Sequence, residues 1–270
     1  GVPHIENLGS RDNIWKAKSE VLEQLHDGCT VFLNDDNDIL HREGKMMIDN
    51  STPYKVVRYG TADEADFRAE NIQLLGEAGI IYDLVAEGKT CSIHLKVPGI
   101  HNVLNSLAAI AAGRAFGVEM EDIQEVLPSY TGGNMRLDIF STPCFDNVKV
   151  IDDAYNASPD SVQAALKILE DMKDGSRKIA ILGDMLELGE HANEAHQLVG
   201  KWVADYGINV LITVGKAGFW TTEAAIMSGM DSKAVFHKNS NREIVHWLKE
   251  NLQHGDRVLV KGSRGLKMEE

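Results

Sequence analysis

The sequence predicts an α/β protein of two domains, the second of which is built on a parallel sheet. Its 270 residues, 43% of them apolar, are enough for two ordinary domains with their own cores. After about residue 137, short apolar segments alternate with longer segments that have a helical period. Strands that alternate with helices in this way form parallel sheets with crossover helices. We therefore expect a domain boundary near residue 137.

Hydrophobic periodicity predicts fewer elements in the first part. Apolar residues repeat on one helical face over 12–26, and Gly28 follows. A short apolar strand is expected at 30–33. Strict alternation over 90–97 predicts a half-buried strand, with 79–88 as its hairpin partner. The alanine-rich segment 101–116 predicts a helix that ends at Gly117.

In the second part the alternation is regular. The expected strands are 148–151, 179–182, 210–214, 234–237 and 258–261, and the expected helices are 159–172, 190–206, 216–227 and 241–252. Polar residues and glycines follow four of these strands. They are Asp152, Asp153, Tyr155 and Asn156; Gly183 and Asp184; Gly215 and Lys216; and Lys261, Gly262, Ser263 and Arg264. Any one group is typical of an ordinary turn, but four together predict a ligand-binding edge of the sheet.

Charge and cysteine content exclude several classes of protein. The chain carries 27 Lys and Arg against 41 Asp and Glu, a net charge of −14, which argues against nonspecific binding to nucleic acid or to anionic membranes. Cys29, Cys91 and Cys144 are too scattered for a disulfide framework or a zinc site. No apolar run approaches the ~18–20 residues of a membrane span. We expect a monomeric cytoplasmic protein with no nucleic-acid partner and no membrane insertion.

One apparent phosphate-binding motif is rejected. Gly88-Lys89-Thr90 matches the last three residues of a phosphate-loop motif. However, Asp83 stands where the motif needs a glycine, and an expected strand follows where the motif needs a helix. We interpret it as a hairpin turn. The sequence contains no other glycine-rich phosphate cradle.

Four residues of the first part have two interpretations each. Asn102 and Asn105 lie on one face of a helical first turn, where their carboxamides could bind an adenine edge, or Asn102 could simply cap the helix. His4 could bind a metal or only pack before the first helix. Lys18 could belong to a functional site, or it could be a surface lysine that extends its charged group into solvent, as such lysines commonly do.

Several segments together resemble the ATP-dependent Mur ligases, most closely those of the MurF type. The segments are HIENLGS at 4–10, AKSE at 17–20, HNVLNSLAA at 101–109, GNMRL at 133–137, IDDAYNASP at 151–159, ILGDMLELG at 181–189, KGSR at 261–264 and ME at 268–269. They follow the order of the family over essentially the whole chain. The Tyr155-Asn156-Ala157 stretch is the part that separates the MurF type from its sister ligases.

The resemblance implies a fold and a domain assignment. Residues 1–137 are expected to be part of the central ATP-binding domain, and residues 138–270 a Rossmann-like C-terminal domain that binds the acceptor. The family's UDP-sugar-binding domain and phosphate loop are expected to be missing, so the chain resembles an inactive fragment. Ser158 stands where the family prefers Asn, and Asn134-Met135 replaces the more usual residue before Arg136.

The resemblance also implies a reaction and roles for individual residues. The family joins D-alanyl-D-alanine to UDP-N-acetylmuramoyl-tripeptide, with ATP and Mg²⁺, through an acyl phosphate. By this resemblance His4 and a carbamylated Lys18 are metal ligands, Asn102 and Asn105 contact adenine, Arg136 reaches the phosphates, Asp153 the ribose, and Lys261, Ser263 and Arg264 bind the acceptor. His4, Lys18 and Arg136 are the expected catalytic residues. Replacing Arg136 or Asp153 with alanine in the complete enzyme is expected to lower turnover by orders of magnitude without unfolding the protein.

Other functions stay open. A sister Mur ligase or a folylpolyglutamate synthetase would share the architecture, and an acceptor screen would separate them. A non-catalytic nucleotide-binding module would also explain the missing phosphate loop. A dinucleotide-dependent oxidoreductase is disfavoured, because no Gly-x-Gly-x-x-Gly follows a strand.

Overall fold

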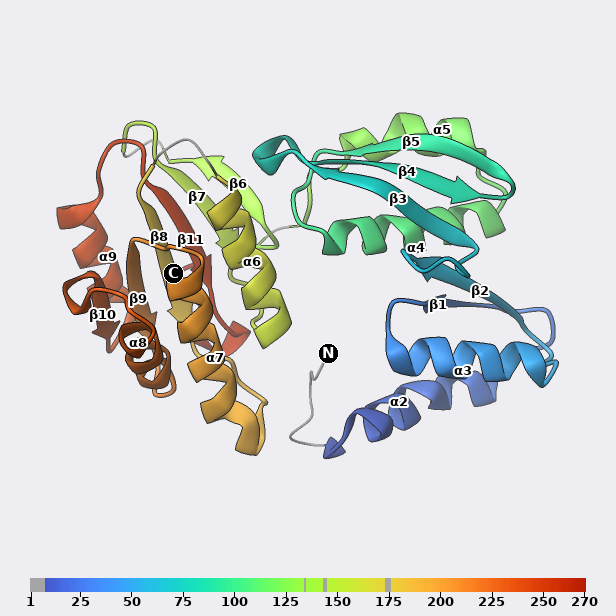
Figure 1. The fold of residues 1–270 in the computed structure, drawn as a ribbon, viewed down its shortest axis with the longest axis horizontal. Helices are drawn as coiled ribbons and strands as arrows, with labels where there is room; N and C mark the ends of the chain where they lie inside the picture. Colours follow the sequence, from blue (N-terminus) through green and yellow to red (C-terminus); the bar gives the residue numbers. More distant parts are fainter. Residues whose placement is uncertain (1–7, 134, 143–144, 173–175) are drawn as a thin grey trace. The chain divides into compact units, whose positions relative to one another are not determined.

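The computed structural model describes residues 8–133, 135–142, 145–172 and 176–270 and divides them into two compact units (Figure 1). The first unit spans residues 10–131, and the second contains residues 132–270. Of the described helices, none combines the length and the apolar character needed to cross a membrane.

The first unit is built on a five-stranded sheet in the order β1-β2-β3-β4-β5. Its strands are β1 (Thr30–Asn34), β2 (Lys55–Gly60), β3 (Phe67–Leu74), β4 (Ile80–Ala86) and β5 (Lys89–Leu95), and its α-helices are α2 (Arg11–Ser19), α3 (Asp38–Asp49), α4 (His101–Ala115) and α5 (Met120–Val126). Short 3₁₀ turns are η1 (Glu20–Gln24), η2 (Gly76–Ala78) and η3 (Leu127–Ser129). β1, β2 and β3 run parallel, whereas β3, β4 and β5 are antiparallel neighbours.

The hairpin predicted around Gly88 is confirmed. Ala86 pairs with Lys89 across a two-residue turn, and both turn residues have positive φ, 53° at Glu87 and 72° at Gly88. Two successive positive φ values are the geometry of a type I′ hairpin turn. Thr90 therefore continues into β5 and not into a helix, so this segment cannot serve as a phosphate loop.

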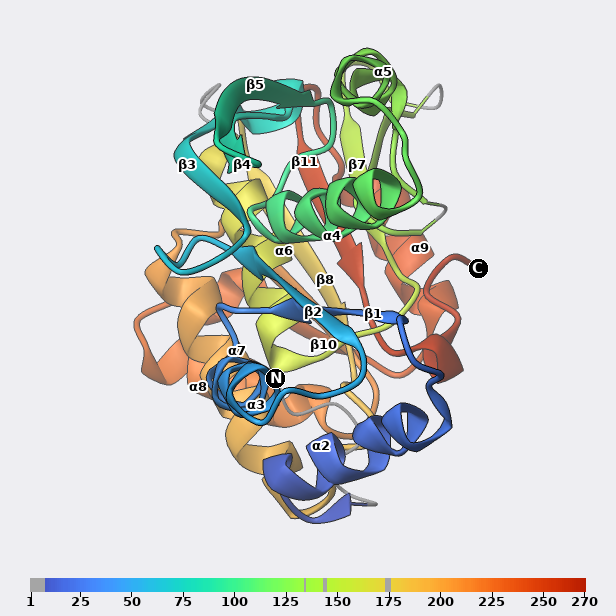
Figure 2. The same cartoon turned by 90° about the vertical axis from the view of Figure 1, so that its right-hand side faces the viewer.

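Helices cover both faces of β1 and β2, with α3 on one face and α4 on the other (Figures 1 and 2). α4 contributes Val103, Leu107 and Ile110 to the core of this unit, which confirms the helix predicted there. α2 ends earlier than predicted, at Ser19, and continues only as the 3₁₀ turn η1. Hydrophobic periodicity does not predict α3, β2, β3 or α5.

The second unit is a six-stranded sheet in the order β10-β9-β8-β11-β7-β6. Its strands are β6 (Asp138–Ser141), β7 (Lys149–Asp153), β8 (Lys178–Gly183), β9 (Val210–Val214), β10 (Val235–Lys238) and β11 (Arg257–Lys261). Its helices are α6 (Pro159–Asp171), α7 (Ala192–Asp205), α8 (Gly218–Met227) and α9 (Asn241–Asn251), with 3₁₀ turns η4 (Gly189–His191), η5 (Ser232–Ala234) and η6 (Arg264–Leu266). The parallel sheet is confirmed for β7 to β11, and the antiparallel edge strand β6 was missed.

The strands of this sheet are apolar because both faces are covered. In β8, Ile179 and Ile181 join the core under α9, whereas Ala180 and Leu182 join the core under α6 and α7. The strand order explains this division. Strands β7, β8, β9 and β10 progress in one direction, and the chain then turns back to β11. Because crossovers are right-handed, the return helix α9 must lie on the opposite face. The carboxyl ends of β8 and β11 flank the switch point of the sheet, where α/β proteins bind ligands.

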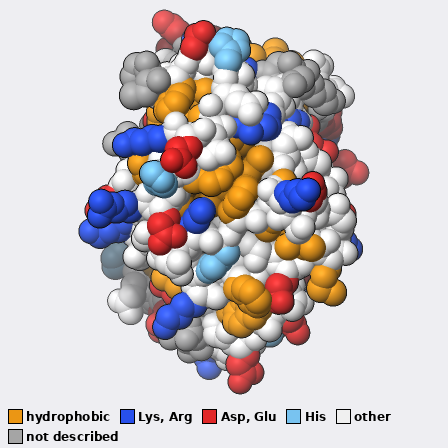
Figure 3. All heavy atoms as spheres, turned by 90° about the vertical axis from the view of Figure 1, so that its left-hand side faces the viewer, with side chains coloured by type: hydrophobic (Ala, Val, Ile, Leu, Met, Phe, Trp, Pro, Cys, Tyr) orange, Lys and Arg blue, Asp and Glu red, His pale blue; other side chains and the backbone are white. Residues whose placement is uncertain are grey.

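The surface of the second unit carries charges of both signs. Figure 3 shows apolar side chains gathered in the middle of one face, with basic and acidic side chains interspersed around them. This face therefore has no large region in which all charged side chains have the same sign.

Candidate functional site

A pocket of about 270 Å³ lies at the carboxyl edge of the second sheet. Three loops line it: Tyr155 to Ser158 after β7, Leu186 to Leu188 after β8, and Ser263 to Gly265 after β11. The polar strand tips predict a binding edge here, and these loops meet beside the switch point. The volume is slightly below the ~300–1,000 Å³ of pockets for drug-sized ligands, which suits a small molecule.

The ion pair between Lys261 and Asp153 fixes the base of this edge. Only 2% of the Lys261 side chain and 13% of the Asp153 side chain are exposed, and Lys261 Nζ lies 2.5 Å from Asp153 Oδ2. Nζ also donates to the backbone carbonyl of Asn156 at 2.9 Å. Burial lowers the pKa of Lys261, against the opposing effect of the Asp153 carboxylate. Lys261 does not line the pocket, so its predicted acceptor contact would have to be indirect.

Arg136 lies on the surface of the same unit, stacked on an aromatic ring. Its guanidinium carbon is 4.0 Å from the centroid of the Tyr155 ring, a cation–π contact. The backbone around it is unusual, because Met135 and Leu137 both have positive φ, 57° and 53°. Leu137 N donates to Asp153 Oδ1 at 3.2 Å, and Tyr155 N donates to Met135 O at 3.1 Å. These bonds hold the Arg136 segment against the loop that follows β7.

Ser263 connects two of the loops that line the pocket. It is buried, its backbone N–H donates to Asp184 O at 3.1 Å, and its Oγ accepts a hydrogen bond from Leu186 N at 2.9 Å. Its O–H proton is not used in that bond and could still be donated to a ligand. Arg264 lines the pocket beside it, with a half-exposed side chain that pairs with Glu269.

Asp184 joins the tip of β8 to the start of α8. Its carboxylate Oδ1 accepts from Ala217 N at 3.0 Å and Gly218 N at 2.8 Å, which satisfies amide groups at the helix start. A Cβ at Gly215 would lie 2.4 Å from the Asp184 carboxyl carbon, so the glycine at that strand tip is required by the close approach of this side chain. From the sequence, Asp184 and Gly215 were two of the strand-tip residues of the predicted ligand-binding edge, with no role assigned to either one.

Ser158, which departs from the family pattern, is the N-cap of α6. Its hydroxyl accepts from Ser161 N at 3.4 Å, and Ser161 Oγ accepts from Ser158 N at 2.9 Å, so the two residues form a capping box. Asn and Ser are comparable N-caps. The departure therefore keeps the local structure of the pocket.

In the first unit, Asn102 and Asn105 contact each other on the first turn of α4. Asn105 Nδ2 donates to Asn102 Oδ1 at 3.3 Å, and Asn102 Nδ2 donates to Pro98 O at 2.7 Å. Asn102 does not cap the helix, since the N-cap is Ile100 with no side-chain bond. No donor within the described part of the chain bonds to the Asn105 Oδ1, which can therefore accept a hydrogen bond from an amino group such as that of adenine.

The predicted metal ligands are only partly described. His4 lies outside the described residues. Lys18 is exposed on α2, one turn after the buried Ile14. Within the described ranges, no three His, Cys, Asp or Glu side chains converge to hold a metal ion. The described residues thus do not by themselves fit a Mg²⁺ site, and the Mg²⁺ prediction depends on His4 and on carbamylation of Lys18.

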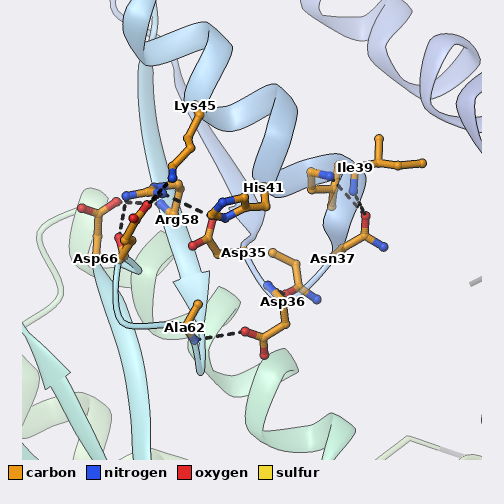
Figure 4. A network of polar contacts seen from close by, with 12 residues as sticks. Asp35, Asp36, Asn37, Ile39, His41, Lys45, Arg58, Ala62 and Asp66 are labelled. Carbon is orange, nitrogen blue, oxygen red and sulfur yellow. Dashed lines mark hydrogen bonds and ion pairs between the residues drawn. The ribbon is translucent and has the colours of Figure 1, made fainter.

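A second polar cluster lies at the carboxyl ends of β1 and β2 (Figure 4). The Asp35 side chain is fully buried; its Oδ1 lies 3.1 Å from His41 Nδ1 and 3.5 Å from Arg58 Nη1. Next to it, the Asp36 carboxylate accepts from Thr61 N at 2.7 Å and Ala62 N at 3.2 Å. These contacts tie the end of β1 to the end of β2. We interpret the cluster as a structural link.

The Arg58 side chain should therefore matter to the stability of the first unit. Arg58→Met leaves the buried Asp35 carboxylate without its cation, and we expect a loss of about 3 kcal/mol in unfolding free energy. Lys45→Met is the matched control, because the Lys45–Glu64 pair is about half exposed and is expected to contribute less than ~1 kcal/mol. Urea unfolding followed by hydrogen exchange in α3 and α4 measures both. Equal losses in the two variants would contradict the prediction.

Three features of the pocket were not predicted as site residues. Leu186 and Leu188 give it an apolar wall, and His196, buried in α7, bonds to the loop that carries them. The sequence signals for the leucines were their place after a strand and within the family-like segment 181–189, and neither signal assigned them a contact with a ligand. His196 gave no signal, because one histidine in an amphipathic helix has no distinguishing pattern.

Comparison with known proteins gives two family matches. The Mur ligase middle domain matches residues 1–113, and the Mur ligase glutamate ligase domain matches residues 135–264. The UDP-N-acetylmuramoyl-tripeptide–D-alanyl-D-alanine ligase of Bacillus subtilis (strain 168) is 32% identical over 271 residues, covering 100% of this chain and 56% of that protein. The chain thus spans about half the length of the curated relatives it matches.

Solved structures agree with these matches. MurF from Acinetobacter baumannii superposes with a TM-score of 0.81 at 25% identity, covering 100% of this chain and 56% of that one. The MurF ligase from Thermotoga maritima in complex with ADP has a TM-score of 0.81 at 22% identity, covering 100% and 58%, and shows the shared fold. With a middle-domain match and a glutamate ligase domain match along its length, the chain belongs to the Mur ligase family.

Proposed function

We propose that this chain is part of an ATP-dependent ligase that joins D-alanyl-D-alanine to UDP-N-acetylmuramoyl-tripeptide through an acyl phosphate. The observation that carries the proposal is the small pocket at the switch point of the second sheet, which combines a cationic side chain, Arg264, with an apolar wall. Similarity to the Bacillus subtilis ligase along the whole chain supports the same reaction.

The pocket has the chemistry that a dipeptide acceptor needs. The Arg264 guanidinium can pair with the dipeptide carboxylate, and Leu186 and Leu188 can contact its methyl groups. Arg136, exposed on the Tyr155 ring, is proposed to neutralise phosphate charge, and Asp153 to contact the ribose. Lys261 then acts by holding Asp153 and the Asn156 carbonyl in place.

The first unit is proposed to bind the nucleotide. Asn102 and Asn105 present paired carboxamides for the adenine edge. The ADP in the Thermotoga maritima structure supports a nucleotide site in proteins of this fold. Mg²⁺ would supply charge neutralisation for the anionic reactants, and His4 with carbamylated Lys18 are the proposed ligands. From the sequence we assign residues 1–137 to the ATP-binding domain and 138–270 to the acceptor domain, in a monomeric cytoplasmic protein; of these, residues 132–137 pack with the second compact unit.

An acceptor screen with the complete protein tests the proposal. The protein is incubated with ATP, Mg²⁺ and either UDP-N-acetylmuramoyl-tripeptide or a folate as the carboxylate substrate. Phosphate release and amide formation are measured with D-alanyl-D-alanine, L-alanine, D-glutamate, L-glutamate or L-lysine as acceptor. Release and ligation only with the dipeptide are expected. Ligation of a single amino acid would instead identify a sister ligase, and polyglutamylation of a folate would identify a folylpolyglutamate synthetase. Nucleotide binding without turnover on any acceptor would identify a non-catalytic module.

A further inference from the structure

His196 is buried in the second unit, and backbone groups occupy both nitrogens of its ring. Only 2% of the residue is exposed. Its Nε2 accepts a hydrogen bond from Met185 N at 3.1 Å, and its Nδ1 lies 2.7 Å from Ala192 O in its own helix. The Trp220 ring packs against it in a T-shaped arrangement, with 6.2 Å between ring centroids.

These two partners determine the protonation state of the ring. A carbonyl oxygen can only accept, so Nδ1 must carry a proton. A backbone N–H can only donate, so Nε2 must be unprotonated. The imidazole is therefore neutral, as the Nδ1–H tautomer. Burial lowers the pKa of His196, against weaker opposing effects of the Ala192 bond and the Asp184 carboxylate, which favours the same neutral form.

The bond from Met185 begins a short chain of contacts that ends in the pocket. The next residue, Leu186, donates its N–H to Ser263 Oγ. Leu186, Glu187 and Leu188 all line the pocket. Glu187 adopts a left-handed conformation, with φ 63°, which a non-glycine residue holds only under local constraint. His196 and Ser263 supply that constraint from two sides, because they accept the N–H groups of the two residues just before it.

We propose that His196 is a positioning residue for the acceptor: as a neutral imidazole it holds the Met185–Leu188 loop in the shape that binds the dipeptide. This inference rests on the proposed function. An apolar side chain could pack in the same place, but it would leave Met185 N–H buried and unpaired, and a buried unpaired amide favours a different loop conformation. Acceptor affinity, more than the chemical step, should then depend on this ring.

Two variants of the complete protein separate a positioning role from simple packing. His196→Leu keeps the bulk but removes the acceptor atom, and we expect KM for D-alanyl-D-alanine to rise about tenfold or more. KM for ATP should stay near the wild-type value, and kcat should fall less than the acceptor KM rises. In His196→Gln the side-chain oxygen can accept from Met185 N–H, so the acceptor KM should stay within about threefold of wild type.

Val203→Ala is the matched control. Val203 is fully buried in the same helix and belongs to the core beneath the sheet, away from the pocket lining. Its truncation should lower stability by leaving a cavity, with no change in the acceptor KM. If Val203→Ala raises the acceptor KM as much as His196→Leu does, the effect is structural and the inference is wrong.

A spectroscopic measurement does not depend on the variants folding. The ¹⁵N chemical shifts of the His196 ring in the complete wild-type protein at pH 7 should report the neutral Nδ1–H tautomer. The Nε2–H tautomer or an imidazolium would overturn the inference.

If the wild-type protein ligates the dipeptide but His196→Leu has an unchanged acceptor KM, this inference fails and the proposed function stands. If the wild-type protein ligates no dipeptide, the proposed function fails and the acceptor role of His196 fails with it.

Discussion

Arg136→Ala in the complete protein is expected to lower kcat for dipeptide ligation by about 10²- to 10³-fold, the size of effect seen when a group that stabilises developing negative charge is removed. The Arg136 side chain is exposed and its described contact is the face of the Tyr155 ring. A cation–π contact at such a site contributes about 0.5–1 kcal/mol, so the fold should be nearly unaffected. Turnover and urea unfolding measured on one preparation separate the two effects.

Two further variants sharpen this test. Arg136→Lys keeps the charge but loses the planar group that stacks on Tyr155, and an intermediate rate is expected. Arg242→Ala removes an exposed arginine from α9, outside the pocket, and should turn over like wild type. Wild-type turnover by Arg136→Ala would remove Arg136 from the proposed site.

Asp153→Ala is expected to destabilise the second unit by about 3–5 kcal/mol at neutral pH. The substitution leaves the ammonium group of Lys261, 2% exposed, without its carboxylate partner. Breaking a buried pair in this way is more costly than replacing the whole pair with apolar groups. The ion pair therefore revises the expectation from sequence that Asp153→Ala would leave the fold intact: loss of activity in this variant would not by itself identify a ribose contact.

The double variant and the pH dependence test this explanation. Asp153→Ala combined with Lys261→Met should be more stable than Asp153→Ala alone, because no charge stays buried. The Lys261 pKa is already lowered by burial, and loss of Asp153 lowers it further. In Asp153→Ala the native state then releases its proton at a lower pH than the unfolded chain, so stability should recover as the pH rises through the folded pKa toward ~10.4. A pH-independent loss, or a double variant no more stable than the single one, would contradict the role of the buried ammonium.

Hydrophobic periodicity correctly predicted strands that are buried on both faces or on one face only. The central residues of strands β8, β9 and β11 are mostly apolar because helices cover both faces of the sheet, and β5 alternates because one of its faces is buried. β3 was missed for a physical reason. Its pairing with β4 shifts register between Glu70 and Gln73, which breaks the alternation that identifies a strand. β6 is short and at an edge, with little burial to create a pattern.

What the sequence determined by itself is the family resemblance, the parallel sheet and the edge at which its polar strand tips gather, since these depend on local order and period. The tertiary structure alone decided which of those tip residues face the pocket and which hold it together. Lys261 meets Asp153 across 108 positions of the chain, and Leu186 meets Ser263 across 77. Neither pair leaves a local pattern, because strand pairing and burial create these contacts only after the sheet forms. His196 shows the same limit: its neutral tautomer follows from two backbone partners that only the folded chain brings to its ring.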